Sequence, residues 1–269
     1  WIPNSRGLPL CAGAHLPVAQ ERQSLKNQHG KGAILSIQSN LDGLQTKASS
    51  RRQLEILRWI LPVGWGLAAI GFLGPWISHP TAALTLAGVD MGEFVKFLPA
   101  VLDGSMRLAR QLFYLPAFAI TVSIALLIGS RRLRYGKLLQ ALGLLLAIPI
   151  SLQLLPPAWS PSSLMTDEFR SQTIALGVSW LLLGTWWLMG RLPSWLPGPL
   201  SATLCVGAIV LPLWQNLTAK PAIDTVYGLS SGAGWGVCLC LTGLALAAVG
   251  STVLTLATLG RPKTFQASA

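Results

Sequence analysis

Long apolar runs separated by short polar segments occupy most of the chain after residue 58. A bilayer requires about 20 apolar residues for each spanning helix, and a backbone in hydrocarbon must satisfy its own hydrogen bonds, so such runs predict helices. We therefore expect an all-α, polytopic transmembrane helix bundle. Its six predicted spans are residues 59–77, 112–130, 138–155, 173–190, 200–215 and 234–259.

Prolines and run lengths refine this prediction. The fifth run is the shortest of the six. Pro149 and Pro212 lie inside the third and fifth spans, where a missing N–H and a ring clash kink a helix. Both kinks concern the shape of the helices and carry no functional meaning.

Composition agrees with a membrane protein. The chain is 52% hydrophobic and 11% charged, whereas an average soluble domain has about 25% charged residues. Its net charge of +11 would suit a nucleic-acid-binding protein only if a folded soluble scaffold carried a basic face. No such scaffold is visible, and basic loops beside anionic headgroups explain most of the excess. We expect the lipid bilayer as a partner and no nucleic acid.

The distribution of Lys and Arg predicts the orientation, because cations near span ends are retained on the cytoplasmic side. With the N-terminus inside, ten cations flank the spans on the cytoplasmic side and five on the opposite side. All six acidic residues after the first span lie with those five. We expect a multi-pass protein of the cell membrane with both termini cytoplasmic. The densest topology determinants lie in one seven-residue loop: Arg131, Arg132, Arg134 and Lys137.

The two ends of the chain differ from its middle. Residues 1–50 are polar and lack sustained apolar periodicity, which predicts a mostly disordered tail before a six-span domain at 51–263 and a short C-terminal tail at 264–269. The chain begins with Trp1, and its first Met is Met91. We expect a fragment or an unusual start codon, and leave open whether residues 1–50 are native.

The segment between the first two spans, residues 78–111, is the longest connection. Asp90 and Glu93 fit a capping pattern that predicts a helix start at Asp90. An apolar stripe follows, Pro99 is expected to divide the helix, and Asp103 is placed to pair with Arg107. We expect an amphipathic extracytoplasmic helical segment, which is either a plain connector or a lid or docking surface. Its stripe consists of Phe94, Phe97, Leu98, Val101 and Leu102.

Catalytic and ligand-binding patterns are missing from the sequence. The six spans as drawn contain no ionisable side chain, and the chain has no zinc-binding His motif and no phosphate-binding Gly loop. Asp167 and Glu168 beside Arg170 are the only compact cluster that would suit a lipid-modifying enzyme. We expect no cofactor, no metal and no enzymatic activity.

Small residues recur at four-residue spacing in the sixth span. Such ridges let two helices approach closely, either inside one bundle or at an interface with another protein. The residues that we assign to helix packing or a partner interface are Gly232, Gly236, Gly243, Ala247 and Ser251.

Two functional hypotheses remain. The first is an accessory or interaction subunit of a membrane complex, whose partners are other membrane protein subunits. The second is the membrane permease half of a transporter driven by a separate ATPase, since six spans with both termini inside suit such permeases. This second idea is an architectural analogy, which is a weak warrant for function.

Overall fold

The computed structural model describes residues 55–259, with gaps at 57, 80–83, 131–132, 134, 157–158, 161, 163, 165 and 229. The chain divides into two compact units, Trp1–Arg51 and Arg52–Ala269, and the structural statements below concern the second. The predicted tails at 1–50 and 264–269 lie outside the described residues.

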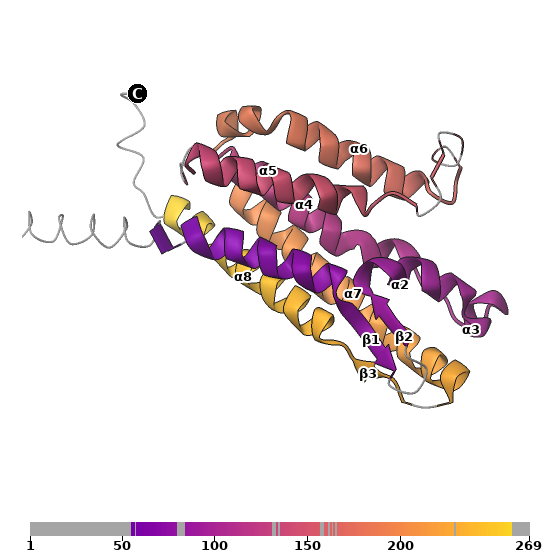
Figure 1. Cartoon of the computed structure of the whole chain (residues 1–269). Coiled ribbons are helices and arrows are strands. Elements are labelled where there is room, and N and C mark those ends of the chain that lie inside the picture. Colours follow the sequence, from indigo (N-terminus) through magenta and orange to yellow (C-terminus); the bar gives the residue numbers. More distant parts are fainter. Residues whose placement is uncertain are drawn as a thin grey trace, which may run out of the picture. The chain divides into compact units, whose positions relative to one another are not determined.

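The described part is mostly helical, as the apolar runs predict (Figure 1). A first helix, Arg58–Leu73, precedes a small sheet. The strands are β1 (Pro75–His79), β2 (Leu84–Ala87) and β3 (Gly232–Ala233). The α-helices are α2 (Gly88–Phe94), α3 (Pro99–Leu102), α4 (Leu115–Ile128), α5 (Lys137–Leu152), α6 (Arg170–Gly184), α7 (Pro197–Tyr227) and α8 (Trp235–Leu259), and the 3₁₀ helices are η1 (Val95–Phe97), η2 (Arg110–Tyr114) and η4 (Trp186–Arg191).

Three helical segments are long and apolar enough to cross a membrane: Arg110–Ile128, Pro197–Tyr227 and Trp235–Ala257. The first helix and α5 are apolar but shorter. At 1.5 Å per residue, the 16 residues of α5 extend about 24 Å, less than the hydrocarbon thickness of about 30 Å. The fifth predicted span, the shortest in the sequence, lies within α7, which has 31 residues.

The small sheet is a feature that the sequence analysis missed. Its strand order is β2-β1-β3, and β1 pairs antiparallel with both neighbours. The predicted first span ran to Ile77, but its helix ends at Leu73. Pro75 favours an extended conformation for Gly74, so the chain leaves the helix and β1 begins.

The helix α4 forms the centre of the bundle and is buried over most of its length. It contacts α5, α6 and α7, and α7 in turn packs against α8. A helix that is buried on all sides needs no polar face, and α4 contains no charged residue.

Two ends of the bundle can be defined by their charged residues. Arg58 lies beside Gly136, and Lys137 begins α5. We name the end that contains Arg58, Lys137 and Arg191 of η4 the basic end; it lies at the left of Figure 1. Glu93, Glu168, Asp224 and the small sheet lie at the other end, which we name the acidic end.

Candidate functional site

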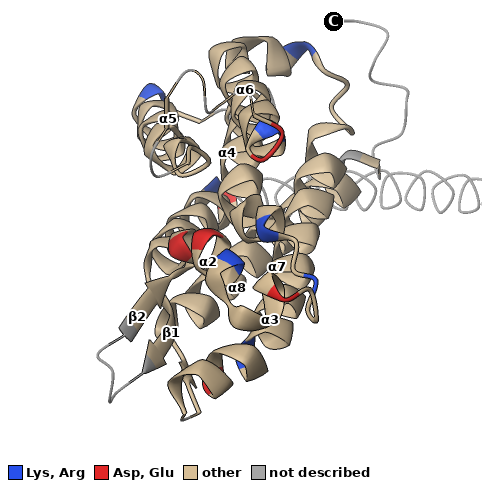
Figure 2. Ribbon diagram, turned by 90° about the vertical axis from the view of Figure 1, so that its right-hand side faces the viewer, with Lys and Arg blue, Asp and Glu red and all other residues tan. Residues whose placement is uncertain are grey.

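Among the described residues, the largest cluster of charged side chains lies at the acidic end, where α2, η2 and the turn before α6 meet. Lys96 Nζ lies 2.6 Å from Glu93 Oε2 and 3.7 Å from Glu168 Oε1. Arg110 Nη1 lies 2.7 Å from Glu168 Oε1 and 3.6 Å from Glu93 Oε1. Figure 2 shows the acidic and basic residues together around α2. We call these four residues the ion cluster.

Arg110 is the central member of the ion cluster. Its side chain is 11% exposed, and its Nη2 also donates a 2.6 Å hydrogen bond to the Glu168 backbone carbonyl. The guanidinium stacks over the Phe169 ring at 4.7 Å. A buried guanidinium is costly unless its donors are used, and here one side chain connects η2 to the turn before α6.

Tyr114 extends the cluster towards α4. Its hydroxyl donates a 3.1 Å hydrogen bond to Glu93 Oε1, and Gly92 of α2 packs against its ring, with no room for a Cβ atom. Close approach at Gly92 therefore places Glu93 within reach of both Tyr114 and Arg110. Each charged group has an opposite partner, an arrangement typical of a structural clamp between segments.

The three acidic-end residues suggested for lipid chemistry do not form one site. Glu168 turns to Arg110 and Lys96, while Asp167 and Arg170 are exposed. Among the described residues, neither of these two has an ion-pair partner within 4 Å, and no group of three or more His, Cys, Asp and Glu side chains is placed to hold a metal.

The predicted outer segment differs in detail from expectation. The helix α2 begins at Gly88 with Ala87 as its N-cap and has no side-chain cap, so the predicted Asp90 cap is wrong; Asp90 lies in the first turn. The helix is divided before Pro99, as predicted, because Leu98 is extended and Pro99 begins α3. The apolar stripe is split as well: Leu98 is buried, Phe94 is partly buried, but Phe97 and Leu102 are 68% and 72% exposed.

The predicted pairing of Asp103 with Arg107 is also wrong. The α3 helix ends at Leu102, and Gly104 has a φ of 77°, so the spacing of one helical turn is lost. Asp103 Oδ1 instead accepts a 2.8 Å hydrogen bond from the Ser105 backbone N–H, which lowers the pKa of Asp103 below its usual range. Arg107 is exposed.

The small residues of α8 face other helices of this chain. A Cβ atom at Gly243 would come within 2.6 Å of the Gly64 carbonyl oxygen, and one at Gly236 within 2.6 Å of Gly74. Ala247 lies beside Gly64. The first helix and α8 are therefore antiparallel and in backbone contact, as small residues permit.

A second contact surface of α8 faces α7. The Oγ atoms of Ser251 and Ser201 are 3.0 Å apart and share a hydrogen bond. A Cβ atom added at Gly198 would lie 3.0 Å from the Ser251 carbonyl oxygen. Gly232 is not in this helix but in β3, paired with Ser78 of β1. Four of the five assigned residues thus lie on faces covered within the bundle.

Of the four topology determinants, only Lys137 is described, and it occupies the exposed first position of α5. Arg131, Arg132 and Arg134 lie outside the described residues. Sequence reasoning missed Lys96, Arg110 and Tyr114 as cluster members. The sequence did place these cations and the acidic residues on the same predicted side of the membrane. That placement does not specify which of them form ion pairs.

Comparison of the chain with protein families, with curated proteins and with solved structures found no match. The class that the structure defines is a mostly helical protein with three helices suited to crossing a membrane.

Proposed function

We propose that the chain is a multi-pass integral membrane protein in which six helices, the first helix and α4 to α8, cross the bilayer. Large apolar side chains on their outer faces support this, since lipid is the solvent that makes such exposure favourable. Leu145 of α5 and Leu181 of α6 are 68% and 66% exposed. The shorter helices gain length from their neighbours: α6 continues through Thr185 into η4. Local thinning of the bilayer accommodates what remains.

The charge distribution supports an orientation with the basic end in the cytoplasm. Arg58, Lys137 and Arg191 lie at that end, where anionic headgroups and the retention of cations favour them. The acidic end then faces outward. An epitope inserted after Gly104, in the turn beyond α3, should be accessible from outside intact cells, and a C-terminal tag should not. A C-terminal tag that is labelled in intact cells would refute this orientation.

We further propose that the protein is a non-catalytic accessory subunit of a membrane complex. The observation that carries this proposal is the exposure of Phe97 and Leu102 at the acidic end. Large apolar side chains exposed together on a polar surface commonly mark a site of association. The ion cluster holds the preceding helix α2 against η2, so these two side chains are presented on a supported segment.

Affinity purification from native membranes in mild detergent, followed by mass spectrometry, tests this proposal. Phe97→Ala and Leu102→Ala should each reduce the yield of a co-purifying membrane protein, because most interface energy resides in a few large side chains. Leu181→Ala is the matched control, since Leu181 is equally exposed but lies on α6, in the predicted lipid-facing belt.

The outcome also separates the two functional hypotheses. Recovery of a nucleotide-binding ATPase as the main partner would favour the permease hypothesis instead. A wild-type preparation without any stable partner, or equal partner yields from all three variants, would contradict the accessory-subunit proposal.

A further inference from the structure

Two hydrogen-bond donors without acceptors belong to side chains that line one apolar pocket at the basic end of the bundle, and a third donor lies beside Gly136, next to the lining residue Tyr135. They are Trp65 Nε1, the Tyr135 hydroxyl and Arg58 Nε. Trp65 and Tyr135 are only 2% and 5% exposed. A buried donor without a partner costs about 1–3 kcal/mol, and the Trp65 and Tyr135 side chains are too buried to take a partner from bulk water. Three such donors beside one pocket indicate a ligand that supplies acceptors.

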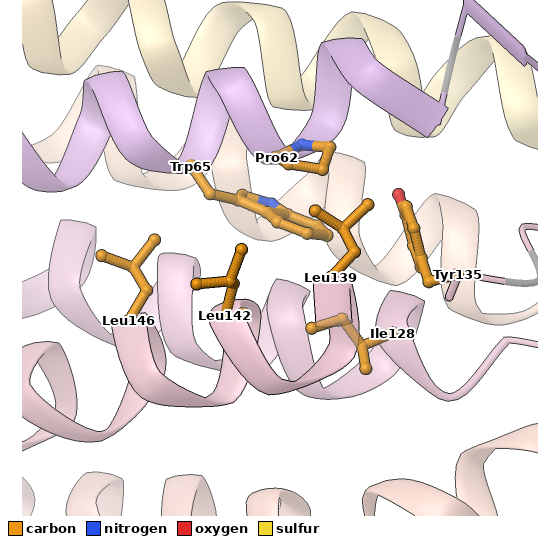
Figure 3. Close-up of a pocket in the computed structure, with 8 residues that line it drawn as sticks. Pro62, Trp65, Ile128, Tyr135, Leu139, Leu142 and Leu146 are labelled. Atoms are coloured by element: carbon orange, nitrogen blue, oxygen red, sulfur yellow. The ribbon is translucent and has the colours of Figure 1, made fainter. Parts of the chain in front are cut away.

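The pocket lies between the first helix and α5 (Figure 3). Its volume is about 190 Å³, which exceeds the roughly 150 Å³ apolar cavity that admits benzene in another protein. The Trp65 ring lies between the two helices, and the Tyr135 hydroxyl is directed towards the first helix. Leu142, which lines the pocket, is 50% exposed, so the pocket opens onto the outer apolar surface. Its remaining lining residues are Pro62, Ile128, Leu139, Gly143 and Leu146.

Charge around the pocket mouth is positive. Arg58 Nη2 lies 3.6 Å from the position of a Cβ atom at Gly136, next to the exposed Lys137. The Arg58 charge acts on Tyr135, although burial is the stronger effect and raises the pKa of Tyr135, keeping its hydroxyl a donor. Among the described residues, no carboxylate lies within 4 Å of Arg58. A ligand with an anionic group would therefore supply the negative charge that is missing at the pocket mouth.

The depth of the pocket fits a molecule with a polar head and an apolar chain. Arg58 begins the first helix and Tyr135 lies two residues before α5, both at headgroup level. Leu146 lies about 10 Å deeper than Leu139 along α5 at 1.5 Å per residue. Trp65 lies two turns beyond Arg58, and helical side chains lean towards the N-terminus, so its indole N–H falls between the head and the deep apolar part.

We propose that this pocket binds an anionic phospholipid from the leaflet at the basic end. The phosphate accepts hydrogen bonds from Arg58 Nε and the Tyr135 hydroxyl, and an ester oxygen accepts one from Trp65 Nε1. One acyl chain lies along Leu139, Leu142 and Leu146, between the first helix and α5. Basic pockets between helices at the cytoplasmic side are typical sites for anionic headgroups.

Native mass spectrometry of the full chain in mild detergent tests the proposal. The probes are dioleoyl phosphatidylglycerol, dioleoyl phosphatidylcholine and oleate, added separately to delipidated protein. The wild type should bind phosphatidylglycerol at least about fivefold more tightly than either of the other two, because it alone combines a net negative phosphate with diacyl esters. Equal affinity for phosphatidylcholine, or tighter binding of oleate, would overturn the proposal.

Two variants and a control locate the site. Arg58→Gln and Tyr135→Phe should each weaken phosphatidylglycerol binding by about tenfold, the range expected for hydrogen bonds to a charged group. Arg191→Gln is the control, because Arg191 is a cation of the same end that stacks on Trp187 away from this pocket. Unchanged binding in both site variants, or an equal loss in Arg191→Gln, would refute the assignment.

A stability measurement separates lipid binding from a purely structural role. In lipid-free detergent, Tyr135→Phe should leave the melting temperature unchanged or raise it, because it removes an unpaired buried hydroxyl. Added phosphatidylglycerol should then stabilise the wild type more than the variant, as expected when a ligand binds only the folded state. A lower melting temperature of the variant without lipid would show that the hydroxyl is already bonded within the protein, and would overturn the proposal.

Discussion

Replacing Gly71 with alanine should separate the first helix from α8. A Cβ atom at Gly71 would overlap the Cys240 backbone nitrogen and come within 2.7 Å of the Gly236 carbonyl oxygen, whereas ordinary contact begins near 3.4 Å. The obstructing atoms are backbone, so no side-chain rotation relieves the overlap. The two helices must move apart by at least about 0.7 Å, and dispersion contacts along the seam weaken steeply with such a gap.

Overpacking of this kind costs about 1–3 kcal/mol. In a protein of this size each kcal/mol lowers the melting temperature by about 2–4 °C, so we expect a decrease of about 2–12 °C. The assay is thermal unfolding in mild detergent, monitored by the loss of the monodisperse peak in size-exclusion chromatography. Gly66→Ala is the matched control on the same helix: its Cβ would meet nothing within 4 Å, and the gain in helix propensity is up to about 1 kcal/mol.

The double variant Gly71→Ala with Gly243→Ala sharpens the test. One separation of the helices relieves both overlaps, so the combined decrease should be smaller than the sum of the single decreases. Equal melting temperatures of Gly71→Ala and Gly66→Ala would refute the reasoning, because they would show that the seam between the first helix and α8 is not in backbone contact.

Three further predictions concern the acidic end. Arg110→Gln should lower the melting temperature by several degrees, since it leaves Glu168 and its partners without the buried cation, whereas Arg107→Gln, at an exposed site, should have little effect. Asp224→Asn should speed proteolysis of the turn before α8, because the Asp224 carboxylate accepts two hydrogen bonds from that turn; equal digestion rates would contradict this. The lowered pKa of Asp103 means that its contribution is fully present above the ordinary value of 3.8 and is lost as the pH falls through the lower folded-state value. Hydrogen exchange at Ser105 should therefore lose protection only as the pH falls below 3.8, and Asp103→Asn should not show this loss after correction for intrinsic rates.

Much of the fold follows from local chemistry that is visible in the amino-acid sequence. Apolar runs predicted the helices, and the divided helix before Pro99 followed from the restricted φ of proline and the lost N–H. The failures share a different cause. The Asp90 cap and the pairing of Asp103 with Arg107 were assigned from spacing alone, but the chain entered α2 two residues earlier and left α3 before the pair could form.

Span length was the least predictable quantity. An apolar run specifies a buried or lipid-exposed segment but not where helical hydrogen bonding stops. Pro75 ended the first helix before its apolar run ended, and Pro212 and Pro221 did not end α7, which continues through both. Whether a helix ends at a proline or continues through it depends on its tertiary context, which the sequence does not show.

The sequence by itself determined the helical state, the apolar character of the outer faces and the separation of acidic from basic flanks, because each depends on residue type and on near neighbours. Only the tertiary structure decided which groups meet. Arg110 and Glu168 are 58 positions apart, and Trp65 lies in the first helix whereas Tyr135 lies just before α5. Electrostatic pairing and the absence of an acceptor depend on distance in space, and chain folding sets that distance independently of separation along the sequence.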